Sequence, residues 1–507
     1  MPSERRSERR SEGLPKAVCI LAWLAMAGGW PEHAEAVLPR SDPGSQGVHV
    51  AGLLDLVDAL DRHEGLHGLV VVRHGHVVAE GWWKPYDSAT PHSLYSLSKS
   101  FTATAVGLAV ADGRLAVADR VVSFFPAEAP GEISPHLRAM RVADLLRMAT
   151  GQQTDPPRPA AGGWVKAFLA HPVPFKPGTH FLYSSSATYM QSAIVEKVTG
   201  EPLLDFLAPR LLAPLGIEGA TWERSPEGIA VGGYGLSLRT GDIAAFGQLL
   251  LQRGRWRNRQ LVPAEWIDAA TARQTANGSD PDSDWDQGYG YQFWRCRHGA
   301  FRGDGAFGQF CVVMPRQDAV VAINAGTSDM QGILDIVWRH LLPALGDDAV
   351  ADDPALLARL RGRLADLALP TPTAGSPSAA FVGRRFTFAD NPRRIEAVAV
   401  ERGEESDLLL LRIAGREERI VCGRGRWVAG ELALGAFERQ AIAASGGWRE
   451  DSFTARICFP RTPFLVTIAL DVNGDGVTLR QRTNVGFGRL EEEPLRGTAT
   501  STAPEPN

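Results

Sequence analysis

The sequence predicts a mixed α/β domain followed by a small all-β domain. The chain has 507 residues, of which 44% are hydrophobic and 22% charged, a composition typical of globular proteins of two or three domains. Residues 370–377 are rich in Pro and Thr and can be neither helix nor central strand. Helical and strand patterns mix before this linker. After it, short runs alternate between apolar and polar residues, as at Phe453, Ala455, Ile457 and Phe459.

The first 36 residues are predicted to be an export signal. Basic residues are frequent up to Lys16, residues 17–30 form an uncharged and mostly apolar run, and Ala34 and Ala36 place small side chains before a cleavage point. The apolar run is too short to span a bilayer. We therefore expect a periplasmic or secreted protein with no stable membrane span after signal removal. An uncut N-terminal anchor is the alternative.

Four parts are expected in the mature chain. Residues 37–345 form the α/β domain, residues 346–380 a helix and the Pro-rich linker, residues 381–490 the β-rich domain, and residues 491–507 a disordered tail. The helix has a favourable start signal at Asp353-Pro354. Its apolar face is formed by leucines 356, 357, 360, 364 and 367.

The charge balance gives no support to nucleic-acid binding. The chain has 53 Lys and Arg against 58 Asp and Glu, a net charge of −5, so no basic excess exists to build a phosphate-binding face. A small-molecule partner is expected instead.

Four cysteines remain once the signal is removed: Cys296, Cys311, Cys422 and Cys458. An exported protein with an even number can oxidise them. Local pairing would join 296 with 311 and 422 with 458, but four cysteines allow three connectivities, and free buried thiols are the equal alternative.

Ser96 and Lys99 form an S-x-x-K element at the start of a predicted helix. Residues three apart are neighbours on a helical surface, so the amine of Lys99 can reach the hydroxyl of Ser96. The exposed amides of a helix N-terminus also favour developing negative charge. The apolar face of this helix is formed by Leu97, Phe101, Ala105 and Leu108. Alone, the tetrapeptide is also consistent with a solvated first helical turn.

Several further segments follow in a fixed order. They are Leu145–Gly151, Tyr183–Ser185, Gly235–Ser237, Ala245–Leu251, Gly288–Trp294 and Gly303–Gln309. Together with Tyr95–Thr102 they resemble the serine β-lactamase-like family, which includes class C β-lactamases, DD-peptidases, esterases and nylon-oligomer amide hydrolases. The resemblance covers about residues 48–345. It implies an α/β (α+β) domain with an antiparallel sheet and an all-α insertion at about residues 86–245, and a reaction without metal or cofactor.

The resemblance also implies a role for each matching residue. Ser96 would be the acylated nucleophile, and Lys99 and Tyr183 would jointly manage its proton and that of the leaving group. A packed loop tyrosine is the alternative for Tyr183. The backbone N–H groups of Ser96 and Ala306 would hold the oxyanion, because Gly305 lets the strand come close.

Two positions depart from the family pattern. Ser185 stands where many relatives have Asn, and a hydroxyl orients the substrate less extensively than an amide. Gly303 stands where relatives have Lys or His, so a cation that would attract a substrate carboxylate is missing. The missing cation argues against penicillin-like substrates, which carry that carboxylate, and fits an ester or amide without one.

No metal site is expected. Asp471–Gly476 begins like a calcium loop, but Arg482 occupies the twelfth position, where an acidic residue is needed. A hairpin turn is the better interpretation.

The sequence therefore predicts an exported serine hydrolase that cleaves an ester or amide through an acyl-enzyme on Ser96. Two alternatives remain. One is a binding or sensor protein that kept the fold and lost turnover, and the other is a β-lactamase or DD-peptidase.

Overall fold

The computed structural model describes residues 38–376, 381, 383–435 and 437–500. The predicted export signal, residues 1–36, lies outside this part of the chain. Among the helices formed by the described residues, none combines the length and the apolar character needed to cross a membrane.

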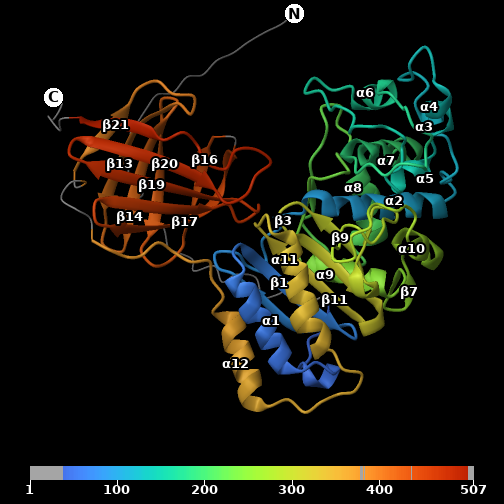
Figure 1. Ribbon diagram of the computed structural model, residues 1–507, viewed down its shortest axis with the longest axis horizontal. Coiled ribbons are helices and arrows are strands. Elements are labelled where there is room, and N and C mark those ends of the chain that lie inside the picture. The colour runs from blue at the N-terminus through green and yellow to red at the C-terminus, as the bar shows by residue number, and fades with distance from the viewer. Residues whose placement is uncertain (1–37, 377–380, 382, 436, 501–507) are drawn as a thin grey trace, which may run out of the picture. The chain divides into compact units, whose positions relative to one another are not determined.

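A six-stranded antiparallel sheet forms the centre of the first domain (Figure 1). The strands in spatial order are β2 (His76–Trp82), β1 (Leu66–Arg73), β11 (Ala319–Ala325), β10 (Gln309–Met314), β9 (Phe301–Gly305) and β8 (Trp294–Arg295). Two of these strands precede residue 83 and four follow residue 293, so the intervening residues are inserted between the two parts of the sheet. His74 and Gly75 form the tight β1–β2 turn, both with positive φ.

Both faces of the sheet are covered by helices. In β1, Val70 and Val72 pack in the core that contains α9 (Thr240–Leu251), whereas Leu69 and Val71 pack in the core that contains α1 (Val50–Arg62). Strands buried on both faces have continuous apolar runs, which explains the valine-rich sequence of β1. Two further helices contact α1: α11 (Met330–Ile336) and α12 (Pro354–Ala365).

Helix α12 begins where the sequence predicts. The Asp353 carboxylate accepts hydrogen bonds from the backbone N–H groups of Ala355 and Leu356, which satisfies two donors that the first helical turn leaves unpaired. Residues 370–376 then follow without regular secondary structure.

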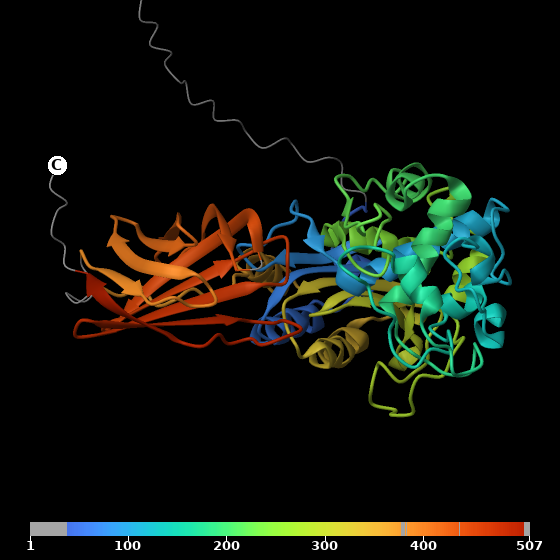
Figure 2. The ribbon, with the colours of Figure 1, turned by 90° about the horizontal axis from the view of Figure 1, so that it is seen from above.

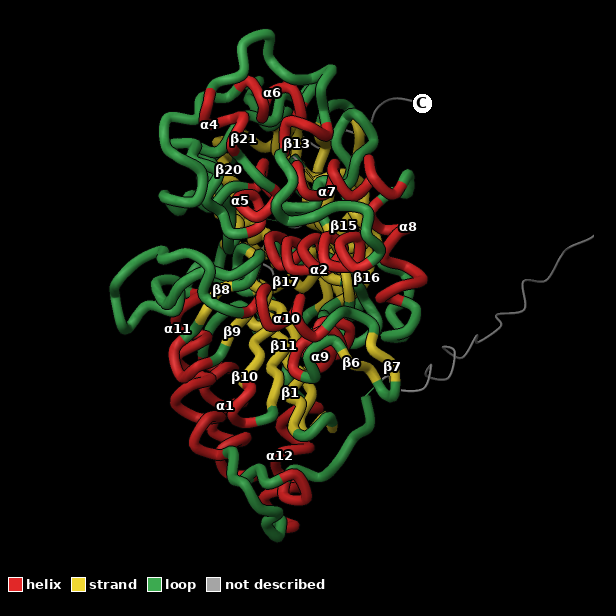
Figure 3. The backbone as a smooth tube through the Cα atoms, turned by 90° about the vertical axis from the view of Figure 1, so that its right-hand side faces the viewer, coloured by secondary structure: helices red, strands yellow, loops and turns green. Residues whose placement is uncertain are grey.

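The insertion between β2 and β8 is mostly helical. Helix α2 (Ser98–Ala111) runs between the helices formed by residues 121–207 and the sheet, with α9 and α10 (Ala264–Thr271) on the sheet side (Figure 3). The other helices are α3 (Val121–Phe124), α4 (Pro135–Ala139), α5 (Val142–Leu146), α6 (Trp164–Ala170), α7 (Ser185–Thr199) and α8 (Leu203–Leu207).

Short strands also occur in the insertion, which the all-α expectation did not include. A three-stranded sheet has the order β3 (His92–Ser93), β5 (Leu236–Leu238) and β4 (Thr221–Trp222). A hairpin of β6 (Arg255–Trp256) and β7 (Arg259–Gln260) follows α9.

The C-terminal domain is all β, as predicted (Figure 2). Ten strands form one sheet, and a pairing of β15 with β17 at Gly423 and Ser445 closes nine of them into a barrel. The strands are β12 (Arg385–Phe388), β13 (Ile395–Arg402), β14 (Ser406–Ile413), β15 (Arg416–Gly423), β16 (Val428–Leu434), β17 (Phe437–Arg449), β18 (Ser452–Cys458), β19 (Leu465–Asn473), β20 (Gly476–Thr483) and β21 (Leu495–Thr500). The alternating Phe453, Ala455, Ile457 and Phe459 lie in the barrel core.

The expectation of a disordered tail from residue 491 is wrong for residues 495–500. These residues form β21, which pairs with β12 and with β20. The physical reason is that these two strands would otherwise be open edges with unpaired backbone groups. Leu495 and Ala499 also pack against the barrel core. The polar composition of the tail concealed this contribution.

All four described cysteines are free and buried, so neither local disulfide forms. Burial raises the thiol pKa to about 11 at Cys296 and to about 12 at Cys311, Cys422 and Cys458. They behave as small apolar core residues.

The barrel contacts the first domain through the segment between β18 and β19 and through the loop after β20. Cys458 and Leu465 belong to the same apolar cluster as residues of α1 and β1. The Tyr86 hydroxyl donates to the carbonyl oxygen of Thr462 at 3.2 Å, and the Asn484 amide donates to that of Gly326 at 2.8 Å.

Candidate active site

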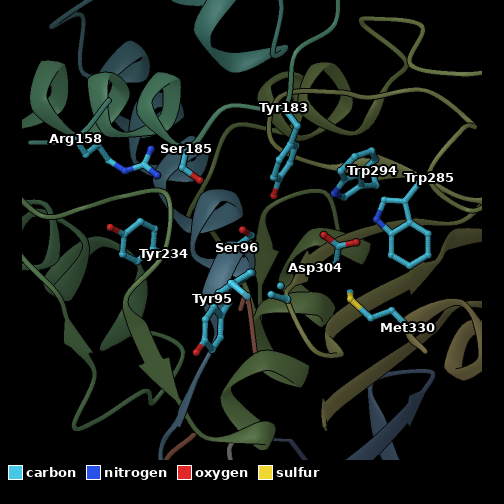
Figure 4. A pocket seen from close by; sticks show the side chains of 13 residues that line it. Tyr95, Ser96, Arg158, Tyr183, Ser185, Tyr234, Trp285, Trp294, Asp304 and Met330 are labelled. Atoms are coloured by element: carbon cyan, nitrogen blue, oxygen red, sulfur yellow. The ribbon is translucent and has the colours of Figure 1, made fainter. Parts of the chain in front are cut away.

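A cavity of about 700 Å³ lies beside the start of α2, the end of β9 and the start of α7 (Figure 4). Five of the six residues predicted from sequence line it, and the sixth, Lys99, contacts one of the five. The lining residues are Tyr95, Ser96, Arg158, Tyr183, Ser185, Tyr234, Trp285, Trp294, Asp304, Gly305, Ala306, Met330 and Phe487. The fold therefore brings together all the residues that the sequence singled out.

Ser96 and Lys99 lie where the chain enters α2. Ser96 is in a 3₁₀ turn, Tyr95–Leu97, and Lys99 is in the first turn of the helix. The Lys99 Nζ lies 3.0 Å from Ser96 Oγ, 3.1 Å from Ser185 Oγ and 2.6 Å from the carbonyl oxygen of Gly233. A neutral amine that donates to Ser185 and Gly233 keeps its lone pair for the proton of Ser96.

Lys99 is poised to lose its proton near neutral pH. Its side chain is buried, and this burial lowers its pKa from 10.5 to about 7. Asp155 and Asp304 oppose the shift, while Arg158 adds to it. The loss of hydration of the ammonium group lowers the Lys99 pKa more than the two carboxylates raise it. About half of the molecules therefore hold a neutral amine at pH 7.

Tyr183 lines the cavity beside Ser96, and the Ser96 side chain acts on its phenol. Burial, followed by the charge of Asp304, raises the pKa of Tyr183 well above 10, so the phenol keeps its proton at neutral pH. Its ring stacks on Trp294 with the centroids 5.2 Å apart and meets Tyr289 edge to face at 6.2 Å. These contacts fix the hydroxyl beside Ser96.

Gly305 lets β9 approach the turn that holds Ser96. A Cβ atom at position 305 would lie 2.0 Å from the carbonyl oxygen of Leu94 and 3.0 Å from the backbone nitrogen of Ser96. No side chain fits there without movement of the backbone. Because Gly305 has no side chain, its backbone lies directly against the backbone amide of Ser96.

Strained residues flank both predicted oxyanion donors. Tyr95 precedes Ser96 with φ +47°, and Phe307 follows Ala306 with φ +70°. Non-glycine residues adopt such angles rarely and at a free-energy cost. The two rings contact each other edge to face, with centroids 5.3 Å apart. Packing between them holds both backbone segments in place.

The structure explains why position 303 carries no cation. A Cβ atom on Gly303 would come within 2.5 Å of Leu97 Cδ1 and of Ser100 Oγ. A Lys or His side chain at this position would require the Leu97 and Ser100 side chains to move. The charged group that β9 presents to the cavity is instead the next residue, Asp304.

Asp304 is a site residue that sequence reasoning missed. It is buried, and its carboxylate pairs with the Arg302 guanidinium at 2.8 Å and receives a hydrogen bond from Trp294. Burial raises its pKa in spite of the arginine. The Arg302 guanidinium lies 4.2 Å from the ring centroid of Trp285. The only available signal was its position immediately before Gly305.

Asp155 is a second residue that the sequence did not reveal. Its carboxylate accepts hydrogen bonds from the Ser184 hydroxyl at 2.5 Å and from the Ser186 backbone N–H at 3.1 Å. It also pairs with Arg158 at 2.8 Å. Asp155 therefore holds the backbone on both sides of Ser185.

Among the described residues, no group of three or more His, Cys, Asp or Glu side chains is placed to hold a metal ion.

Comparison with known proteins gives consistent matches. The family model described as Beta-lactamase matches residues 53–336. The 6-aminohexanoate-dimer hydrolase of Paenarthrobacter ureafaciens is 26% identical over 317 residues, which cover 56% of this chain and 80% of that protein. An Escherichia coli K12 protein named "Putative D-alanyl-D-alanine carboxypeptidase" is 22% identical over 335 residues, covering 51% and 77%.

A solved structure shares the fold. The crystal structure of a "putative beta-lactamase" from Bacteroides dorei DSM 17855 superposes with a TM-score of 0.50 at 18% identity, covering 58% of this chain and 99% of that one. The segment matched by the family model contains the six-stranded sheet from β1 to β11, the insertion and the six predicted site residues. It contains none of the barrel strands.

Proposed function

This chain belongs to the β-lactamase family of serine hydrolases, and from that premise we propose that it cleaves a carboxylic ester or amide through an acyl-enzyme on Ser96. The family and fold predicted from the sequence are thereby confirmed, and the chain is a hydrolase of that family. The substrate, the roles of individual residues and export belong to the proposal.

One observation supports the proposal above all others. A buried lysine with a pKa of about 7 lies 3.0 Å from a serine hydroxyl that lines a cavity. A serine hydroxyl is a weak nucleophile until a neighbouring group accepts its proton, and a lysine can accept it only as the neutral amine. Tyr183 keeps its own proton, so Lys99 is the base and Tyr183 the proton donor.

The reaction follows from this assignment. Lys99 takes the Ser96 proton as Oγ attacks the substrate carbonyl carbon, and the carbonyl oxygen becomes an oxyanion that the Ser96 and Ala306 N–H groups stabilise. The carbon–heteroatom bond then breaks. The leaving alcohol or amine takes a proton from Tyr183, which recovers it from Lys99. Water attacks the acyl ester, releases the carboxylic acid and returns the proton to Ser96.

The charges around the cavity favour a substrate without a carboxylate. The two charged side chains among its lining residues are each paired within the chain: Arg158 with Asp155 and Asp304 with Arg302. Gly303 supplies no cation of the kind expected in penicillin-binding relatives, and a side chain there would meet those of Leu97 and Ser100. A substrate carboxylate would meet Asp304 without a free cation nearby.

An active-site probe combined with turnover assays tests the proposal. The full chain and its Ser96→Ala variant are treated with a fluorophosphonate probe and mapped by peptide mass spectrometry. Both are also assayed with p-nitrophenyl acetate, short amides and nitrocefin. Ser88→Ala, which removes an exposed serine outside the cavity, is the matched control. Label on Ser96 and turnover of the ester or amide, both lost only in Ser96→Ala, are expected.

The same experiment separates the two alternatives. An acyl adduct that forms on Ser96 but never turns over indicates a sensor protein. Turnover of nitrocefin in preference to esters and amides indicates a β-lactamase. Absence of label from Ser96 in the wild-type protein contradicts the proposed nucleophile.

We also propose that the chain is exported, on the basis of the composition of residues 1–36. After expression in a bacterial host, N-terminal sequencing should find Val37 first, and the protein should be in the periplasm or medium. A chain that retains residues 1–36 in the membrane fraction would show an uncut anchor instead.

A further inference from the structure

Phe487 is an exposed apolar residue at the edge of the cavity. Its exposed fraction is 80%, and among the described residues only Val421, at 45%, is another large hydrophobic residue in the exposed class. Phe487 lies in the loop between β20 and β21 of the barrel, yet it lines the same cavity as Ser96. An apolar side chain kept in water beside a cavity is typical of a surface that a ligand covers.

The loop that carries Phe487 is fastened to the first domain. The Asn484 amide donates to the carbonyl oxygens of Gly326 at 2.8 Å and Pro463 at 2.9 Å, and its own oxygen accepts from the Leu465 N–H at 2.7 Å. The next residue, Val485, is 2% exposed. These contacts of Asn484 and Val485 fix the start of the loop, and the loop holds the Phe487 side chain in its exposed position.

Glycine at position 326 makes this attachment possible. A Cβ atom there would lie 2.2 Å from the Pro463 carbonyl oxygen and 2.7 Å from the Asn484 amide nitrogen. The barrel segment and the end of β11 approach each other as closely as backbone allows.

The ring of Phe487 continues an aromatic wall of the first domain. Its centroid lies 5.9 Å from that of Tyr95 and 4.9 Å from that of Phe307. Phe464 of the barrel adds to the same group, at 6.5 Å from Tyr95 and 6.0 Å from Phe307. Tyr95 and Phe307 are the strained residues next to the two proposed oxyanion donors, so this wall borders the position of the substrate carbonyl.

The wall lies on the side of Ser96 away from Tyr183. Tyr183, the proposed proton donor to the leaving group, packs against Tyr289 and Trp294. Phe487 instead contacts the rings of Tyr95 and Phe307. Figure 4 shows Tyr183 and Tyr95 on opposite sides of Ser96. A substrate whose leaving group faces Tyr183 directs its acyl group toward Tyr95.

We propose that Phe487 of the C-terminal barrel completes the acyl-binding wall and makes the enzyme select esters or amides with a large apolar acyl group. This inference rests on the proposed function and names its substrate class. It also assigns a role to the barrel, which supplies a specificity residue to the cavity of the other domain. A substrate that covers Phe487 gains roughly fourfold in binding for each methylene that leaves water.

Acyl-chain selectivity in Phe487 variants tests the inference. p-Nitrophenyl acetate, butyrate and octanoate share one leaving group, so their kcat/KM values compare acyl groups alone. The octanoate-to-acetate ratio should fall about tenfold in Phe487→Ala and be largely retained in Phe487→Leu. Val421→Ala, which removes the other exposed apolar side chain of the barrel at a site outside the cavity, should keep the wild-type ratio.

The outcomes distinguish the inference from the proposed function. Fluorophosphonate labelling of Ser96 in each variant shows that the site is assembled. Labelled Phe487→Ala with the wild-type octanoate-to-acetate ratio overturns the inference and leaves the proposed function intact. An equal loss for all three esters also overturns it, because the contact would not be with the acyl chain. A wild-type chain that neither labels nor hydrolyses any of the esters overturns both.

Discussion

Replacing Lys99 by Arg keeps a positive side chain of similar length and removes the ability to lose a proton. Burial brings the Lys99 pKa from 10.5 to about 7, so the neutral fraction at pH 7 is about one half, against roughly one in 3,000 for an unshifted lysine. An arginine is neutral in less than about one molecule in 10⁵ at this pH. The loss of kcat/KM should reach the range of about 10²- to 10⁴-fold that general-base catalysis supplies.

The assay is the pH dependence of ester hydrolysis in three proteins. In the wild type, kcat/KM should rise with pH and reach half its maximum near pH 7, because only the neutral amine of Lys99 accepts the Ser96 proton. Lys99→Arg should be nearly as inactive as Lys99→Ala across the range. Lys197→Arg, at an exposed lysine in α7, should match the wild type. A Lys99→Arg variant with more than about a tenth of wild-type activity would refute the role of Lys99 as base.

Three further results are expected. Gly305→Ala should lower kcat by about 10²- to 10³-fold, because the added methyl group displaces the oxyanion donors. Gly131→Ala is the control, since its Cβ position is open space, and it should keep the wild-type kcat. Equal activities of the two variants would contradict the close approach of β9 to Ser96. Asp155→Asn removes a carboxylate that raises the Lys99 pKa, so the rising limb of the pH profile should move to lower pH; an unchanged limb would count against the coupling. In a Cys19→Ser variant, the four buried thiols should react with a disulfide reagent only after denaturation, and fast reaction of the native variant would contradict their burial.

Local patterns made much of the fold predictable. The start of α12 at Asp353 and the alternation in β18 depend on residues close in sequence, and the structure has both of them. The strand β21 escaped prediction because its partners, β12 and β20, determine it more than its own polar residues do. A strand that is fixed by backbone pairing with its neighbours need not show an alternation of apolar and polar residues.

The site residues also fall into two groups: those that local sequence predicts and those that only tertiary packing brings together. Ser96 and Lys99 are three residues apart, so helical geometry alone predicts their contact, which is 3.0 Å in the structure. Asp155 and Phe487 act on groups far away in the chain, through side-chain contacts that only tertiary packing creates. Asp304 belongs with this second group, because its place in the site depends on the cavity that tertiary packing forms around it.

The hydrogen bonds of Asn484 indicate how the same two-domain arrangement can be recognised in the sequences of other proteins. Because hydrogen bonds and apolar contacts fasten the barrel directly to the first domain, the tether at residues 370–376 is not the only link between them, and doubling its length would cost only about 0.6 kcal/mol. The tether is thus a poor marker of shared architecture. A better marker is the remote pair itself: an asparagine just after a C-terminal hairpin strand, together with a glycine directly after the strand that corresponds to β11.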